Sequence, residues 1–332
     1  MNRLSNRAET VAMIEAGKRL LLAGDEAMLA SLPSGAWIGG TIPYFMTEEG
    51  GLSTTEKIFV TVLPEVITGH LVRVYEHDNL ALLANDHPGH GFSILLLPAF
   101  SEIHASFAEN VTNYSGIFDR PLVGWISGVA LSDIGKVMPK VFDGTTGLCS
   151  ATQAVVLHVE LPEDHLAMVD IVNPFPQGSG PAISFARTGF STSTALIDGV
   201  PTGFAAYIAA QAIDTRLPLV ADYHGALINV SIQSIDADSG QVSFYAPVFS
   251  NVTYRFAEPI EDYADRFISQ LQSCGAPILF SCNCVLNYLY GELAGKRTGS
   301  LTGPMTFGEI AYILLNQTAI YLTVYDTSFQ KT

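Results

Sequence analysis

The N-terminal segment places side chains at helical spacing. The spacing i, i+3, i+7 and i+10 is marked by Val11, Ile14, Lys18 and Leu21. We therefore predict helical structure over residues 8–32. Asn6 and Glu9 are placed like a capping box at its start. Gly24 interrupts the pattern, and Asp25 is expected to cap a second short helix.

From residue 37 onward the pattern changes to short apolar runs separated by glycine, proline, asparagine and aspartate. Such runs are typical of strands, and they cover residues 37–46, 57–63, 70–76, 92–98, 122–129, 153–161, 166–172, 182–186, 193–198, 218–234, 241–248, 251–257 and 277–281. Residues 236–240 predict a hairpin turn. Amphipathic spacing predicts helices after Ser101, over 203–212 and over 260–271.

Strands outnumber helices in this pattern, and consecutive strands are often joined by short turns. Both features favour an α+β fold with mixed or mostly antiparallel sheets covered by helices. A chain of 332 residues is long enough for two similar halves. A change of composition at 145–152 predicts a boundary between residues 1–150 and residues 151–332.

Composition narrows the range of partners. The formal net charge of −16 produces a field that repels nucleic acid and anionic lipid surfaces. The N-terminus lacks the apolar core of a signal peptide, and the apolar tract 310–325 is too short to span a bilayer. Four cysteines in such a chain indicate reduced thiols, so we expect a cytoplasmic protein without a membrane partner.

The most informative segment covers residues 277–293, where an apolar run meets Ser281, Cys282, Asn283 and Cys284. If Asn283 caps a following helix, Cys284 lies at a helix N-terminus that favours a thiolate. The two thiols are then candidates for ligand contact or for nucleophilic chemistry. The alternative is that both are small buried apolar residues, as free cysteines usually are.

Two other groups of polar residues are candidates. Asp222 and His224 are two apart in a predicted strand, so they project from one face of an apolar run, where a carboxylate orients an imidazole. Residues 86–90, with Glu102 and His104, contain metal-ligand types, but no known spacing is satisfied. We predict no metal site there, and we expect His104 to be a core residue. The sequence identifies no cofactor.

The tail resembles the C-terminal half of FIST sensory domains. The resemblance rests on Phe280-Ser-Cys-Asn-Cys284, Tyr290-Gly-Glu292 and Thr306-Phe-Gly-Glu-Ile310, and Gly39-Gly40 and Val123-Gly-Trp-Ile-Ser-Gly128 resemble strands of the N-terminal half. It implies a domain that binds small ligands, amino acids among them, for signal transduction. One subset of the family senses nitric oxide through haem. The resemblance marks Cys282 and Glu309, and we expect no fused kinase or cyclase.

The resulting hypothesis is a cytoplasmic sensory protein of FIST-like type. Its pocket is expected to be lined by residues 281–284 and Glu309, with Asp222 and His224 nearby. Cys282 and Asn283 would contact the ligand, Glu309 would accept a hydrogen bond or a cationic group, and a separate signalling protein would read the bound state. The alternatives are an enzyme that uses Cys282 or Cys284 as nucleophile with His224 and Asp222 as base, and a haem-binding gas sensor.

Overall fold

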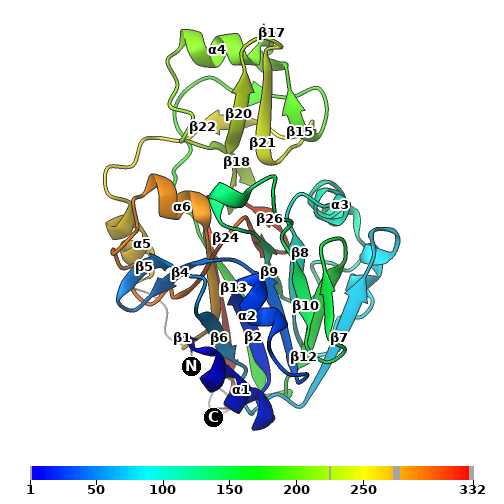
Figure 1. Ribbon diagram of the computed structural model, residues 1–332. Helices are drawn as coiled ribbons and strands as arrows, with labels where there is room; N and C mark the ends of the chain where they lie inside the picture. Colours follow the sequence, from blue (N-terminus) through cyan, green and yellow to red (C-terminus); the bar gives the residue numbers. More distant parts are fainter. Residues whose placement is uncertain (1, 224–225, 272–276, 329–332) are drawn as a thin grey trace.

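Three six-stranded sheets form the body of the protein (Figure 1). The computed structural model describes residues 2–223, 226–271 and 277–328. The first sheet has the order β1 (Asn2–Ser5), β6 (Ile58–Val62), β2 (Leu20–Gly24), β3 (Trp37–Thr41), β10 (Val141–Asp143) and β11 (Leu148–Ser150). The second has the order β26 (Ile313–Leu315), β25 (Glu309–Ala311), β9 (Leu122–Ser127), β8 (Gly91–Pro98), β12 (Ala154–Glu160) and β7 (Gly69–Tyr75). The third has the order β13 (His165–Val172), β27 (Ala319–Asp326), β23 (Ile278–Cys284), β24 (Gly303–Thr306), β4 (Tyr44–Thr47) and β5 (Gly50–Ser53).

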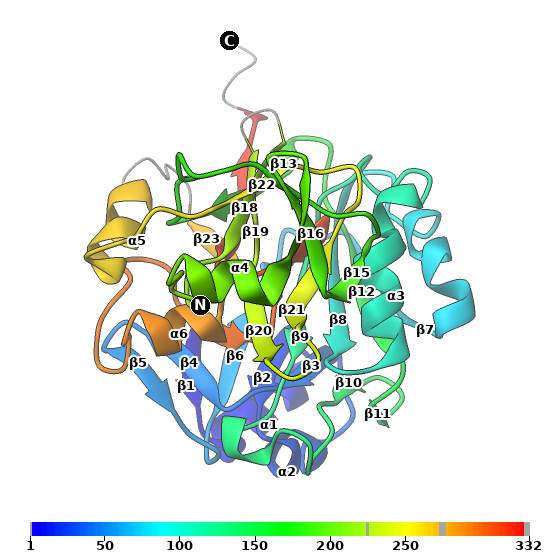
Figure 2. The same ribbon diagram turned by 90° about the horizontal axis from the view of Figure 1, so that it is seen from above.

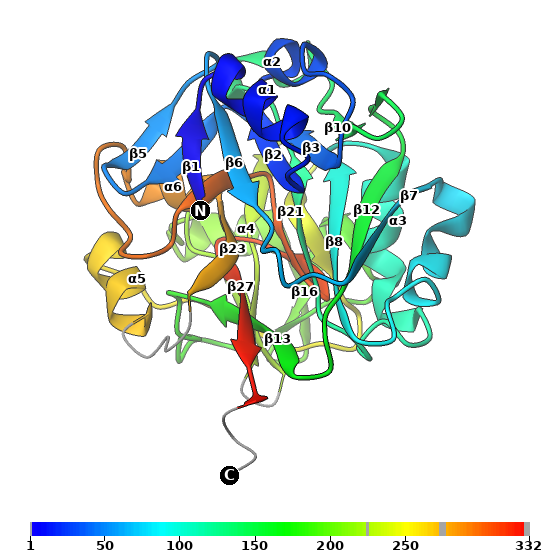
Figure 3. The same cartoon turned by 90° about the horizontal axis from the view of Figure 1, so that it is seen from below.

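Alternation along the strands explains why the three sheets share one core. Successive strand residues point to opposite faces. In β8, Ile94 and Leu96 face the central core that all three sheets enclose, whereas Leu95 and Leu97 face outward. The outward face of the first sheet is covered by α1 (Arg7–Glu15) and α2 (Glu26–Ala30), as the view from below shows (Figure 3).

Helices also cover the outer face of the second sheet and flank the third. The second sheet packs against η1 (His77–Ala84), α3 (Glu102–Asn110) and η2 (Val111–Asn113). The remaining body helices are η3 (Leu131–Asp133), α5 (Tyr263–Leu271) and α6 (Val285–Tyr290). Among the described residues, no helix is long and apolar enough to cross a membrane.

A small lobe lies on top of the body (Figures 1 and 2). One of its sheets has the order β17 (Val200–Gly203), β16 (Thr194–Ile197), β14 (Ile183–Ser184), β22 (Tyr254–Phe256), β18 (Leu219–Tyr223) and β19 (Ala226–Val230). The other has the order β15 (Gly189–Thr192), β21 (Gln241–Val248) and β20 (Ile232–Asp236). With α4 (Phe204–Ala210) they enclose a separate aromatic core around Phe185, Phe204 and Phe244.

The fold class predicted from the sequence is confirmed: the protein is α+β, with mixed and antiparallel sheets and helices on their outer faces. The caps at Asn6, Asp25 and Ser101 are also present. The division at residue 150 stays a prediction. The second and third sheets each combine strands from before and after that residue, and the small lobe is built from residues 183–256.

Three element predictions were wrong. The expected single strand 37–46 is two strands, β3 and β4, which belong to different sheets. Residues Leu20–Gly24 form β2 and not helix, because Leu20 and Leu22 face α1 and α2 while Leu21 and Ala23 face the central core. The expected single strand 218–234 is three strands, β18, β19 and β20, of which β18 and β19 form an antiparallel pair. A continuous apolar run does not show where a buried strand turns back.

One glutamine joins the lobe to the body. Gln317 lies between β26 and β27, and its Nε2 donates to the carbonyl of Arg216 over 3.0 Å. Its side-chain oxygen accepts from Ser231 Oγ over 2.7 Å, and its carbonyl accepts from Asn229 Nδ2 over 3.2 Å. The residue is fully buried and its φ is +48°, in the left-handed region that costs a non-glycine residue about 1–2 kcal/mol. Through these contacts Gln317 holds the small lobe against the body.

Candidate ligand-binding site

Two strands of the tail, which the sequence predicts to form the floor of one pocket, meet inside the body. Cys282 and Cys284 are on β23, and Glu309 is on β25. The Glu309 carboxyl lies close enough to raise the pKa of both thiols beyond the effect of their burial. We call Ser281, Cys282, Asn283, Cys284 and Glu309 the tail cluster.

The tail cluster is a packed interior layer. All five residues are at most 4% exposed. Ser281 Oγ donates to the carbonyl of Thr302 over 2.8 Å, and Cys282 Sγ donates to the carbonyl of Gly124 over 3.5 Å. These residues therefore join neighbouring strands, and none of them lines a cavity among those found in the described structure.

Asn283 does not cap the helix that follows. The strand continues through Cys284, which occupies the N-cap position of α6 without a side-chain hydrogen bond. Asn283 Oδ1 instead accepts from Asn287 Nδ2 over 2.8 Å. The prediction placed the cap one residue early because asparagine is a far more common N-cap than cysteine.

Glu309 is a carboxyl without a counter-charge. Its Oε2 accepts from the hydroxyl of Thr318 over 2.7 Å and from the Thr318 N–H over 3.3 Å. Its Oε1 has no hydrogen-bond partner within the described residues. Burial raises the pKa of Glu309 from 4.5 to about 8, against the smaller opposite effect of the Thr318 bonds. The side chain is therefore mainly protonated at neutral pH.

The two thiols of the tail cluster lack the surroundings of a nucleophile. Burial, followed by the nearby Glu309 carboxyl, raises the pKa of Cys282 and of Cys284 well above 9. Reactive cysteines have a lowered pKa and are accessible. Cys149 is exposed, but burial of its sulfur also raises its pKa, and it lies at the edge of the first sheet.

The second predicted pair does not join the tail cluster. Asp222 is exposed on β18 of the small lobe and lines no cavity among those found. The expectation that it sits in a buried apolar run was wrong, because the run ends at Ala221 and β18 reaches the surface there. His224 lies outside the described residues, as does Cys274.

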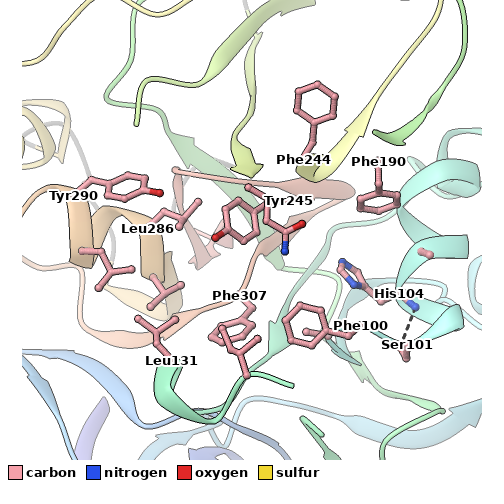
Figure 4. A pocket seen from close by; sticks show the side chains of 16 residues that line it. Phe100, Ser101, His104, Leu131, Phe190, Phe244, Tyr245, Leu286, Tyr290 and Phe307 are labelled. Carbon is pink, nitrogen blue, oxygen red and sulfur yellow. Dashed lines mark hydrogen bonds between the residues drawn. The ribbon is translucent and has the colours of Figure 1, made fainter. Parts of the chain in front are cut away.

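A cavity of about 270 Å³ lies between the body and the small lobe (Figure 4). The body contributes the turn before α3, α3 itself, the turn after η3, α6 and Phe307. The lobe contributes side chains from β15, β20 and β21. Its aromatic lining residues are Phe100, Phe190, Phe244, Tyr245, Tyr290 and Phe307. Mainly apolar walls with few polar groups are typical of small-molecule sites.

His104 is the histidine that lines this cavity. It is in the first turn of α3, and its ring lies 6.1 Å from the ring of Phe190. Although the residue is partly exposed, its Nε2 is inaccessible to water and has no hydrogen-bond partner in the described part of the chain. Burial lowers the pKa of His104 from 6.5 to about 4, so the ring is neutral at pH 7. The expected core histidine is therefore a cavity-lining residue.

Phe100 reaches the cavity through a strained turn. Its φ is +64°, in the left-handed region that side chains other than glycine rarely adopt. The turn places the ring of Phe100 5.9 Å from that of Phe307, edge to face, while Ser101 caps α3. Strained residues of this kind often occur at ligand sites. No local signal in the sequence distinguishes Phe100 from an ordinary apolar residue at a strand end.

Tyr245 and Tyr290 connect the cavity with the tail cluster. Burial, followed by the neighbouring Tyr290 and Cys284, raises the pKa of Tyr245 to about 12. Burial and Cys284 also raise the pKa of Tyr290. Val285 and Leu286, which follow Cys284 directly, line the cavity. The tail cluster is thus the layer behind the cavity wall.

A separate buried network occupies the outer face of the second sheet, near residues 86–90. Tyr75 donates its hydroxyl proton to Asp86 over 2.8 Å, so it accepts from His158 Nε2 over 3.0 Å. His158 Nδ1 then accepts from Ser93 Oγ, which accepts from His87 Nδ1, each over 2.8 Å. This proton order satisfies each of these bonds, and Nε2 of His87, at the end of the chain, has no partner within the described residues. No local pattern of residues indicates that His158 and Ser93 join Asp86.

Comparison with known proteins identifies a family without identifying an activity. Residues 5–325 match a family that is described as a family of unknown function (DUF6976). No curated protein matches the chain.

Proposed function

We propose that this chain, which belongs to the DUF6976 family, is a small-molecule-binding sensory protein whose ligand occupies the cavity between the small lobe and the body. One observation carries the proposal: the wall of a mainly apolar cavity includes His104, whose buried Nε2 has no partner within the described residues. A buried polar atom without a hydrogen bond is unfavourable by about 1–3 kcal/mol, and a ligand that bonds to Nε2 once the imidazole turns into the cavity removes this penalty. The resemblance to FIST sensory domains and the expected cytoplasmic location agree with this role.

A route from the cavity to the small lobe supports a sensory role. The N–H of Cys284, at the start of α6, donates to the carbonyl of Thr318 over 3.1 Å. Thr318 adjoins Gln317, whose side chain and carbonyl hold the small lobe. A ligand that contacts both α6 and β21 therefore favours one arrangement of lobe and body over others. A partner protein would read that arrangement.

The alternative of a cysteine-dependent enzyme has less support. Cys282 and Cys284 are buried, their pKa values are raised, and neither lines the cavity. Of the proposed base, Asp222 is exposed on β18 and His224 lies outside the described residues. Slow labelling of both thiols by iodoacetamide at neutral pH is the expected result, and rapid labelling of one of them would favour the enzyme.

Haem binding is the second candidate, and His104 is the observation that favours it. A neutral imidazole with a free Nε2 in an apolar cavity is a suitable axial ligand. The cavity volume of about 270 Å³ lies below the usual ~300–1,000 Å³ of sites for drug-sized ligands, so a macrocycle would fit only after the lobe moves. An absorbance scan of haem-supplemented protein without a Soret band would remove this candidate.

The proposed site can be tested by blocking the cavity. Ala105 lines the cavity from α3, and Ala206 is exposed on α4 and lines no cavity among those found. We expect native mass spectrometry, combined with thermal shifts in a fragment set of mixed charge, to detect binding to the wild type and to Ala206→Phe. Ala105→Phe should lose it. Binding that persists in Ala105→Phe at the wild-type level would place the site elsewhere.

A further inference from the structure

The charge of the cavity wall restricts the ligand. Among the described residues that line the cavity, none carries a carboxylate, ammonium or guanidinium group. A charged ligand would therefore lose its hydration without gaining an ionic partner, which is strongly unfavourable. The formal net charge of −16 adds a general repulsion of anions. The wall thus selects for uncharged molecules.

Two pairs of rings shape one end of the cavity. Phe100 contacts Phe307 with centroids 5.9 Å apart and an interplanar angle of 74°. His104 contacts Phe190 with centroids 6.1 Å apart at 69°. Rings in such edge-to-face contact form walls that accept a further flat ring by stacking or edge contact. An aromatic cage has space for a cation between its rings, but the rings of these two pairs are in contact and leave no such space.

Polar groups lie at both ends of this apolar space. In the view of Figure 4, His104 and Tyr290 are at opposite ends, with Phe307 and Tyr245 between them. Nε2 of His104 is buried and has no partner. The hydroxyls of Tyr245 and Tyr290 also form no hydrogen bond within the described structure, although water can reach them. The wall therefore holds one buried polar atom, Nε2 of His104, which a ligand contacts once the imidazole turns into the cavity. Three further polar groups already reach water, namely the two tyrosine hydroxyls and the exposed side-chain amide of Gln233.

We infer that the ligand is an uncharged, mainly apolar ring compound with a hydroxyl or similar group that hydrogen-bonds to Nε2 of His104. This inference rests on the proposed function, because it names the ligand class of the same cavity. A neutral imidazole has one donor nitrogen and one acceptor nitrogen. A hydroxyl can accept from the first or donate to the second, so it satisfies Nε2 in either tautomer.

Four probes of similar size test the inference by isothermal titration calorimetry or NMR at pH 7. Toluene is apolar, p-cresol adds a hydroxyl, 4-methylbenzoate is an anion and benzyltrimethylammonium is a cation. We expect p-cresol to bind about tenfold more tightly than toluene, as one hydrogen bond to an otherwise unpaired buried atom provides. The two charged probes should bind more weakly than toluene.

Variants of His104 assign the contact. In His104→Phe an aromatic ring is kept and the nitrogen is lost, so p-cresol should bind only as tightly as toluene. The affinity for toluene should differ between this variant and the wild type by less than about threefold. His104→Gln restores a polar group and should recover part of the difference. A tenfold preference for p-cresol that survives in His104→Phe would overturn the assignment to Nε2. The midpoint of thermal unfolding of each variant verifies that it is folded.

The outcomes separate the ligand class from the site. Stronger binding of benzyltrimethylammonium or 4-methylbenzoate, blocked by Ala105→Phe, would keep the cavity as the site and overturn the uncharged class. Binding of p-cresol that Ala105→Phe does not affect would overturn the proposed function. If none of the four probes binds while a co-purified molecule occupies the cavity, the ring-compound class is wrong and the site stands.

Discussion

The tail cluster and the cavity are adjacent regions that treat polar atoms in opposite ways. In the tail cluster, the hydroxyl of Ser281, the thiol of Cys282 and the side-chain oxygen of Asn283 bond to neighbouring segments, although Nδ2 of Asn283 has no partner within the described residues. In the cavity, Nε2 of His104 and the two tyrosine hydroxyls have no partner within the described residues. The tail cluster is recognised from its sequence motif, whereas the cavity is recognised from the structure.

The difference shows how a structural layer is distinguished from a ligand site. A buried polar group that bonds to its own strands holds those strands in register, and it has nothing left to offer a ligand. Glu309 Oε1 lacks a partner too, but protonation lowers the penalty because the neutral form carries no buried charge. Only the cavity combines an unpaired polar atom with space. The tail cluster therefore supports the wall to which the ligand binds.

The largest expected effect is the dependence of stability on pH caused by Glu309. Its pKa is about 8 in the folded protein, raised from 4.5 by burial, so the folded state binds the proton more tightly. The stability that this proton provides is complete below pH 4.5 and is lost as the pH rises through 8. Between pH 6.5 and 8.5 the contribution of Glu309 to the free energy of unfolding should fall by about 2 kcal/mol, as measured by urea denaturation of the wild type and of Glu309→Gln.

Glu309→Gln provides the matched control for this prediction. The amide keeps the shape and a carbonyl oxygen for Thr318, but it does not ionise. Its unfolding free energy should lack the fall that Glu309 causes. The lowered pKa values of His104 and His158 make both proteins gain stability above pH 6.5, so this contribution cancels in the difference between the wild type and Glu309→Gln. A difference between the two proteins that is equal at both pH values would show that Glu309 is ionised and solvated.

The second prediction compares the addition of side-chain volume to each region. Cys282→Leu inserts carbon atoms into a packed core and should lower the free energy of unfolding by about 1–3 kcal/mol. Ala105→Leu adds more carbon atoms to the cavity, where space exists, and should change it by less than about 0.5 kcal/mol. Urea denaturation of both variants measures the difference. Equal losses would mean that the cavity is not open in solution.

The third prediction compares two buried imidazoles. His158 bonds through both ring nitrogens, to Tyr75 and to Ser93, whereas Nε2 of His104 has no partner. His158→Phe should lower the free energy of unfolding by about 1–2 kcal/mol, because it breaks the buried chain. His104→Phe should leave it unchanged or raise it slightly at pH 7. A larger loss in His104→Phe than in His158→Phe would contradict the assignment of His104 to the cavity.

The same imidazoles also determine the response to acid. The pKa of each falls from 6.5 to about 4 on folding, mainly through burial, so each contributes stability above pH 6.5 that is lost as the pH falls towards 4. His104→Phe should therefore unfold at a lower pH than the wild type. This comparison is made by circular dichroism during acid titration.

Local signals were sufficient for much of the fold, but not for the site. The caps at Asn6 and Ser101 and the turn at 236–240 depend on neighbours within a few residues, so the sequence predicted them. Leu20–Gly24 was misassigned because five consecutive buried residues have no visible period. Tertiary contact on both faces, with α1 on one side and the central core on the other, decides their structure.

The cavity could not be predicted because its walls come from distant parts of the chain. Phe100, Phe190, Tyr245 and Leu286 lie on four different segments, and only the packing of the lobe onto the body brings them together. The tail cluster was found because its residues are close in sequence, and the convergence of Cys282 with Glu309 was predicted from the resemblance. A sequence motif can thus identify a wall without showing on which side of it the ligand lies.

The smallest expected effect concerns the strained turn at Phe100. Glycine adopts a φ of +64° without strain, which stabilises the turn. It also removes the ring and makes the unfolded backbone more flexible, which is destabilising. Because these effects offset each other, Phe100→Gly should change the free energy of unfolding by less than about 0.5 kcal/mol. Phe100→Ala loses the ring and keeps the strain, and it should be less stable than Phe100→Gly by about 1 kcal/mol. Both variants should bind p-cresol several times more weakly than the wild type, because the edge-to-face pair with Phe307 is lost. Unaltered binding in both, with the expected difference in stability, would show that Phe100 shapes the turn and does not contact the ligand.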